Sequence, residues 1–110
     1  MNSIANQCRR KVETDGLVSY MNDTKWRELC ITFSSFDLPP RWRTLDLLTG
    51  HLSEWDRGWF HHVGPDYCSI EWLEIDPSQC DRGSVCAVLR EVGAPFEESD
   101  QFLRVIGYKR

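Results

Sequence analysis

The sequence predicts an α+β fold, in which two to three helices pack on a mainly antiparallel sheet of four to five strands. Two stretches repeat their apolar residues at helical spacing. Short segments rich in aromatic and β-branched residues lie between and after them, separated by turn residues. The chain has 110 residues, 41% of them hydrophobic, and five tryptophans, which suits one packed core. Helices and strands in this order favour a layer of helices on an antiparallel sheet.

The first twenty residues are predicted to be an N-terminal extension of a single domain that spans residues 21–110. Ile4, Cys8 and Val12 recur every four residues, which indicates a short helix with a thin apolar stripe. Gly16 interrupts that pattern, so the helix should end before it.

The two clearest helices each begin at a capping residue and end at a helix breaker. The first follows Asn22, Asp23 and Thr24, all of which favour a helix N-cap, and it must end before Pro39 and Pro40. Its apolar face consists of Trp26, Leu29, Cys30, Phe33 and Phe36. The second has its apolar positions at Val85, Val88, Leu89 and Val92, with Asp81 or Ser84 as the cap and Gly93 beyond its end.

The strands are predicted from alternation and turn signals. Residues 41–48 form the first strand, and residues 51–54 and 58–63 flank a hairpin connection at residues 55–58. Residues 68–75 are apolar on both faces, which is typical of a central strand, and residues 102–108 form the last. We expect Trp26 and Trp72 in the core, whereas Trp42, Trp55 and Trp59 either pack inside or form an exposed patch.

Neither the cysteines nor the histidines predict a metal or a cofactor. The five cysteines have no C-x-x-C spacing, so we interpret them as reduced thiols. His51, His61, His62 and Cys68 are the only arrangement that hints at a metal, but His61 and His62 are adjacent and would point to opposite faces of a strand. No catalytic motif is present, and Glu71 and Glu74 face opposite ways if they lie on one strand.

Charge is concentrated in the middle of the chain. The net charge is −4, which argues against nucleic-acid binding through a basic surface. Between Glu54 and Asp76 there are six carboxylates against Arg57 alone, a local net charge of −5. Aromatic anchors inside an acidic rim suit a partner protein with a basic surface. The predicted contact residues are Glu54, Trp55, Asp56, Trp59, Glu71 and Glu74.

Five segments together resemble a small bacterial family that is catalogued only as a domain of unknown function. They read NDTKW at 22–26, PRWRTLDLL at 40–48, SEWD at 53–56, WFHH at 59–62 and SIEWLEI at 69–75. The resemblance covers about residues 21–108 and implies no catalytic residues. By size and charge alone the chain also resembles immunity proteins encoded beside bacterial toxins.

These observations favour a non-enzymatic, cytoplasmic binding protein, for which the immunity protein of a cognate toxin is our leading hypothesis. No apolar run is long enough to span a membrane, and no secretory signal is present. Two alternatives stay open. One is a small enzyme or ligand-binding domain that uses His61 or His62 with Glu54 or Glu71. The other is a homo-oligomer that pairs through its exposed tryptophans.

Overall fold

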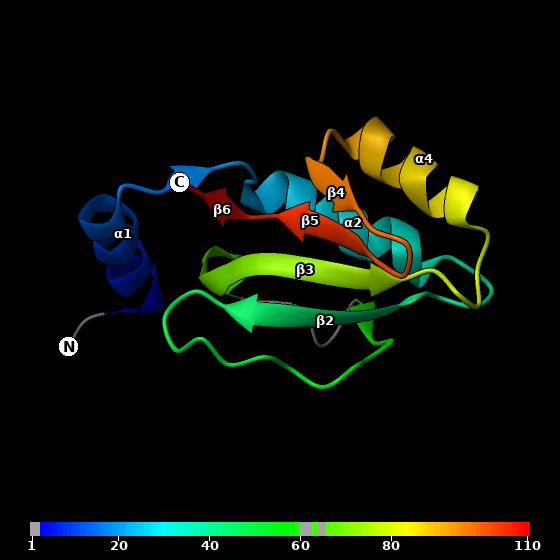
Figure 1. Cartoon of the computed structure of the whole chain (residues 1–110), viewed down its shortest axis with the longest axis horizontal. Coiled ribbons are helices and arrows are strands. Elements are labelled where there is room, and N and C mark those ends of the chain that lie inside the picture. The colour runs from blue at the N-terminus through cyan, green and yellow to red at the C-terminus, as the bar shows by residue number, and fades with distance from the viewer. Residues whose placement is uncertain (1–2, 60–62, 64–65) are drawn as a thin grey trace.

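The computed structural model describes residues 3–59, 63 and 66–110 of the chain (Figure 1). The helices and strands of these residues are α1 (Ile4–Asp15), β1 (Val18–Ser19), α2 (Asp23–Ser34), β2 (Arg41–Asp46), the 3-10 helix η1 (Tyr67–Ser69), β3 (Ile70–Asp76), α4 (Arg82–Val92), β4 (Phe96–Glu98), β5 (Leu103–Ile106) and β6 (Tyr108–Lys109).

The strands form two antiparallel sheets. The larger sheet has the order β2-β3-β5-β4, and β1 pairs with β6 in a separate two-stranded sheet. All pairings are antiparallel, and the register shifts at a bulge between Leu45 and Asp46. Figure 1 shows α2 running behind the strands of the larger sheet. The predicted α+β fold is therefore confirmed.

Helices α2 and α4 form where the sequence predicts them, because each has a strong cap and one apolar face. The side chain of Asn22 accepts a hydrogen bond from the backbone N–H of Lys25, which caps α2. Asp81 caps α4 in the same way, and Gly93 ends it in the left-handed conformation. Their buried residues pack against the inward side chains of β3 and β5. This single core includes Trp26, Leu29, Phe33, Val85, Leu89, Leu73, Ile75, Leu103 and Val105.

Over the described residues the predicted hairpin after β2 is wrong, and residues 60–62 of its second strand lie outside the described part of the chain. Residues 47–58 form no strand and make only isolated bridges to β2, between Leu45 and Leu52 and between Trp42 and Asp56. A turn reverses the chain after β2, because the carboxylate of Asp46 accepts hydrogen bonds from the backbone N–H groups of Leu48 and Thr49. The segment instead lies along the free edge of β2.

The C-terminal strand also differs from its prediction. Residues 102–108 divide into β5 and β6 at Gly107, whose N–H donates to the carbonyl of Glu71. A Cβ atom at this position would lie 2.3 Å from the carbonyl oxygen of Ile70, so only glycine fits here. The short edge strand β4 was not predicted, since its three residues carry two adjacent glutamates.

Helix α1 lies at one end of the molecule, away from the main core (Figure 1). It confirms the helix predicted near the N-terminus, and it packs on η1. Cys8 is its one buried residue. Across the part of the chain that the structure describes, no helix combines the length and the apolar character needed to cross a bilayer.

Candidate functional site

The larger sheet has two unlike faces. The inner face packs against α2 and α4, and no described element covers the other, which we call the outer face. Strand alternation and register place its residues: Arg41 and Arg43 on β2, Trp72, Glu74 and Asp76 on β3, and Phe102 and Arg104 in and beside β5. This face therefore gathers arginines, carboxylates and aromatic rings from strands that are far apart in sequence.

Glu74 lies at the centre of the outer face, between two arginines on neighbouring strands. Its Oε1 accepts a hydrogen bond from Nε of Arg43 at 2.8 Å. Its Oε2 accepts from Nη2 of Arg104 at 2.8 Å and from Nε of the same residue at 3.2 Å. The Glu74 side chain is only 7% exposed, so the carboxylate end of both ion pairs is largely shielded from water. This carboxylate is neutralised inside the protein.

Another ion pair joins β2 and β3 two residues further along, between Arg41 and Asp76. The guanidinium of Arg41 donates to the carboxylate of Asp76, which also accepts from the backbone N–H of Ser78. Burial on its own would raise the pKa of Asp76, but the hydrogen bonds from Ser78 and Arg41 outweigh it and lower the pKa below 3.8. Asp76 is therefore held in its ionised form.

Aromatic rings alternate with the guanidinium groups on this face. Trp55, from the segment along β2, has Arg43 4.5 Å and Arg41 5.3 Å from its ring centroid. Its ring also lies 5.2 Å from that of Phe102. Arg104 lies 4.2 Å from the ring of Trp72 on the other side of Glu74. Stacked cations and half-buried rings give the outer face a rigid, mixed polar and aromatic surface.

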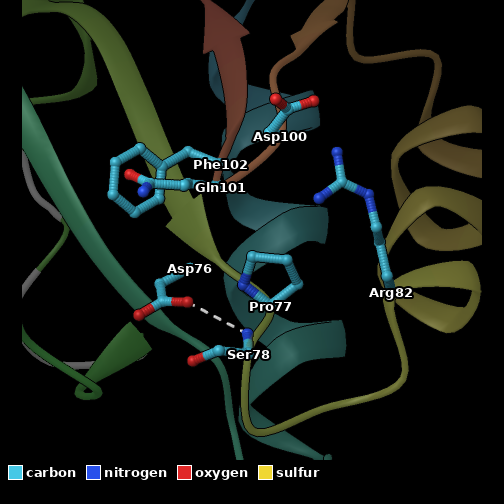
Figure 2. Close-up of a pocket in the computed structure, with 7 residues that line it drawn as sticks. All are labelled: Asp76, Pro77, Ser78, Arg82, Asp100, Gln101 and Phe102. Atoms are coloured by element: carbon cyan, nitrogen blue, oxygen red, sulfur yellow. Dashed lines mark hydrogen bonds between the residues drawn. The ribbon is translucent and has the colours of Figure 1, made fainter.

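Two cavities adjoin the outer face, and Phe102 lines both. The larger, about 490 Å³, lies at the end of β3 and is bounded by Asp76, Pro77, Ser78, Arg82, Asp100, Gln101 and Phe102. Figure 2 shows Asp76 on one side of it and Arg82 extending from α4 toward Asp100 on the other. The smaller, about 290 Å³, is lined by Glu74, Glu97, Glu98, Ser99, Phe102 and Arg104. The ring of Phe102 therefore borders two hollows edged by carboxylates.

Of the six predicted contact residues, two are buried and four are accessible. Trp59 is 1% exposed, donates its indole N–H to the carbonyl of Pro40 and packs against Phe33, so the expectation that it contacts a partner does not fit its position. The same holds for Glu74, because its carboxylate is buried between arginines. Burial also assigns Trp42 to the core. Trp72 is only partly buried, although the sequence predicts it in the core.

The other four predicted residues are accessible but do not form one patch. Glu54 is exposed, and Trp55 and Asp56 are half-buried in the segment along β2. Asp56 also accepts a hydrogen bond from the backbone N–H of Gly58. Glu71 lines a separate cavity of about 620 Å³ near α1, together with residues of β6. The structure therefore brings Trp55 to the outer face and leaves Glu71 away from it.

The proposed histidine chemistry lies outside the described residues, since these exclude His61 and His62. Within residues 3–59, 63 and 66–110, no three or more His, Cys, Asp or Glu side chains group so that they could hold a metal ion. Sequence reasoning missed Arg41, Arg43, Phe102 and Arg104. The alternation of Arg41 and Arg43 around Trp42 is the signal that could have placed two arginines on one face.

The comparisons with known proteins identify a family but no activity. A family model described as a family of unknown function, DUF6678, matches residues 8–110. No curated protein and no solved structure matches the chain. The family match includes residues 8–20, which lie outside the resemblance seen in the sequence and include most of α1.

Proposed function

We propose that this chain, which belongs to the DUF6678 family of unknown function, is a non-enzymatic domain that binds a partner protein on its outer face. The observation that carries the proposal is the composition of this face. Trp and Arg are the residue types most enriched where protein contacts contribute most affinity, and here they are stacked on one another beside Phe102.

Rigidity supports the same proposal. The arginines of the outer face are held by Glu74 and Asp76, so less side-chain freedom would be lost when a partner binds. Trp55 is fixed between Arg43 and Phe102 but keeps part of its surface accessible. A preorganised aromatic residue of this kind suits the centre of an interface.

The charges around the cavities favour a partner with basic side chains. Asp100 is exposed and forms no ion pair with any residue that the structure describes. Among the described residues, the ion pairs of Glu97 and Glu98 are all exposed: Glu97 pairs with Lys109 at 3.4 Å, and Glu98 pairs with Arg82 at 3.4 Å and with Arg90 at 4.0 Å. Exposed pairs contribute little free energy, so a partner's lysine or arginine can replace them. Phe102 lies between these carboxylates as an apolar contact.

A cognate bacterial toxin is the partner class that we propose. The small size, the net charge of −4 and the acidic cavity rims suit an immunity protein that covers a basic toxin surface. We place the protein in the cytoplasm, where its five cysteines would stay reduced. A toxin domain in the neighbouring open reading frame would supply the candidate partner directly.

The test begins with affinity capture of the partner from native lysate, followed by binding measurements on purified variants. Trp55→Ala should weaken binding at least tenfold, which corresponds to roughly 1.4 kcal/mol of binding free energy, because it removes the indole ring at the centre of the proposed interface. Ile31→Ala is the matched control, since Ile31 is also exposed but lies on α2. Equal affinity of the Trp55 variant and the wild type would refute the proposed surface, and capture of no stoichiometric partner would refute the function.

Charge is tested separately through association rates. Asp100→Lys should slow association with a basic partner severalfold, because charges at the rim of an interface act on the encounter of the two proteins. The difference from the wild type should grow as the salt concentration falls, since salt screens these charges. Glu28→Lys, an equal charge change on the exposed surface of α2, should have a smaller effect. If both variants slow association equally, only the net charge matters, and the outer face has no special role.

A further inference from the structure

Two arginines of the outer face share one arrangement, in which a guanidinium lies over an aromatic ring and binds a buried carboxylate. Arg43 lies 4.5 Å from the ring centroid of Trp55 and binds Glu74 at 2.8 Å. Arg104 lies 4.2 Å from the ring centroid of Trp72 and binds the same carboxylate at 2.8 Å. An aromatic ring beside a carboxylate is therefore a combination that holds a guanidinium in this fold.

The cavity of about 490 Å³ at the end of β3 contains the same combination. The ring of Phe102 and the carboxylates of Asp76 and Asp100 line it, and Figure 2 shows all three around it. Its volume lies within the range of about 300–1,000 Å³ that is usual for pockets of small molecules, so a long side chain can enter it. The cavity therefore offers an aromatic wall and two carboxylates to the end of such a side chain.

Both carboxylates can accept further hydrogen bonds. The Oδ1 atom of Asp76 accepts from the backbone N–H of Ser78 at 3.0 Å, and its Oδ2 atom accepts from Arg41. A carboxylate has about four lone-pair sites, so these two bonds leave acceptor capacity on Asp76. Asp100 is exposed and forms no ion pair within the described part of the chain. A donor that enters the cavity thus meets one buried and one exposed acceptor.

Arg82 bears on the sign of charge that the cavity favours. It is the one cationic side chain among the described residues that line the cavity, and Figure 2 shows it on the side opposite Asp76. Its Nη2 atom donates to the carbonyl of Ser99 at 2.7 Å and pairs with Glu98 at 3.4 Å, so its own charge is partly compensated. Two carboxylates against one guanidinium give the lining a net charge of −1. The cavity therefore favours a cation over an anion.

We propose that this cavity receives the side chain of an arginine of the partner protein, with its guanidinium against the ring of Phe102, paired with Asp100, and with Asp76 as a further acceptor. The inference rests on the proposed function, because the arginine belongs to the protein that binds the outer face. Arginine suits the cavity better than lysine. A planar guanidinium stacks on a ring and presents five N–H donors, whereas an ammonium group is compact and more strongly hydrated.

Nuclear magnetic resonance of the isotope-labelled full chain tests the cavity without the partner. The probe is n-butylguanidinium chloride, which mimics the end of an arginine side chain, titrated at constant ionic strength. Saturable shifts are expected at the backbone amides of Ser78, Gln101 and Phe102, which line the cavity. The ammonium analogue, n-butylammonium, should bind at least about threefold more weakly, and neutral n-butylurea should cause no saturable shift. Absence of saturable shifts with n-butylguanidinium would overturn the site, and equal binding of the two cations would overturn the preference for arginine.

Variants separate the cavity from the general attraction of an acidic protein for cations. Asp100→Asn should weaken n-butylguanidinium binding at least about threefold, because it removes the exposed carboxylate. Phe102→Leu keeps an apolar wall but removes the aromatic ring, so the preference for guanidinium over ammonium should disappear. Glu13→Gln is the matched control, since it removes one exposed charge on α1 at the other end of the molecule (Figure 1). Equal weakening by Asp100→Asn and Glu13→Gln would overturn the local role. The spectrum of each variant shows whether it is folded, and two cavity variants keep the test valid if one is not.

Binding of the partner separates this inference from the proposed function. Asp100→Asn and Phe102→Leu should each weaken the affinity for the partner at least about fivefold, and n-butylguanidinium should compete with the partner. If Trp55→Ala weakens the complex but neither cavity variant does, the outer face is the interface and the arginine pocket is refuted. If n-butylguanidinium binds but no stoichiometric partner is captured, the proposed function fails, and the assignment of the arginine to a partner protein fails with it.

Discussion

Replacing Glu74 by Gln removes the negative charge on which the outer face is organised, while keeping the size and shape of the side chain. Glu74 accepts three hydrogen bonds from Arg43 and Arg104. A glutamine has one acceptor oxygen, and its NH₂ group would face a guanidinium that also only donates. The variant therefore loses hydrogen bonds to at least one arginine and leaves two cations without their counter-charge.

The magnitude follows from the burial of the three side chains. Hydrogen bonds to charged groups contribute roughly 1.5–3 kcal/mol. The side chains of Arg43 and Arg104 are 26% and 41% exposed, so water compensates for part of the loss. We expect Glu74→Gln to lower the free energy of unfolding by about 2 kcal/mol, which corresponds to a fall in Tm of roughly 8 °C for a domain of this size.

The chain offers a closely matched control. Glu97 on β4 is also directly opposite Arg104, but its side chain is 56% exposed and pairs with Lys109 at 3.4 Å. Glu97→Gln should change the free energy of unfolding by less than about 0.5 kcal/mol. Urea denaturation is the suitable assay, because guanidinium chloride would screen the ion pairs. Equal destabilisation by both variants would refute the reasoning, since it would show that burial between two arginines adds nothing.

Three further substitutions test other features of the fold. Gly107→Ala should lower the free energy of unfolding by about 3 kcal/mol in urea, because the new Cβ would lie 2.3 Å from the carbonyl oxygen of Ile70; a loss below about 1 kcal/mol would contradict this close approach. Asn22→Ala should cost about 1 kcal/mol through the lost cap of α2, measured in the same way, and no loss would show that the hydrogen bond from Lys25 is dispensable. The lowered pKa of Asp76 means that its ionised form stabilises the fold above pH 3.8, and that this contribution is lost as the pH falls through the lowered value. Asp76→Asn should accordingly make stability fall less steeply in acid titrations, and an unchanged slope would contradict the assignment.

The helices could be predicted because their signals are local. Asn22, Asp81 and Gly93 mark the ends of α2 and α4 within a few residues of the apolar positions that the helices bury. The presence of a mainly antiparallel sheet was predicted, but the pairing of its strands was not. Residues 51–54 have the composition of a strand, yet after the turn at Asp46 this part of the chain makes only an isolated bridge to β2, and Trp59 is buried in the core.

The outer face could not be predicted because it depends on register. Glu74 meets Arg43 across 31 residues and Arg104 across 30, and a shift of one residue would turn these side chains to opposite faces. In sequence, Glu74 belongs to an acidic run, and in space it lies between two arginines. The count of local charge predicts a basic partner, but it cannot separate the buried Glu74 from the exposed Glu98 and Asp100 near Phe102.

The two margins of the larger sheet bear on how the protein behaves at high concentration. Exposed strand edges are where chains add to one another and begin to aggregate. Residues 47–58 lie along the margin of β2, and the other margin is β4, which is three residues long, follows Pro95 and carries Glu97 and Glu98. Neither margin presents a long, uncharged strand to a second molecule. We therefore expect solutions of this protein to resist fibril growth, so that any association between copies would have to use side-chain surfaces.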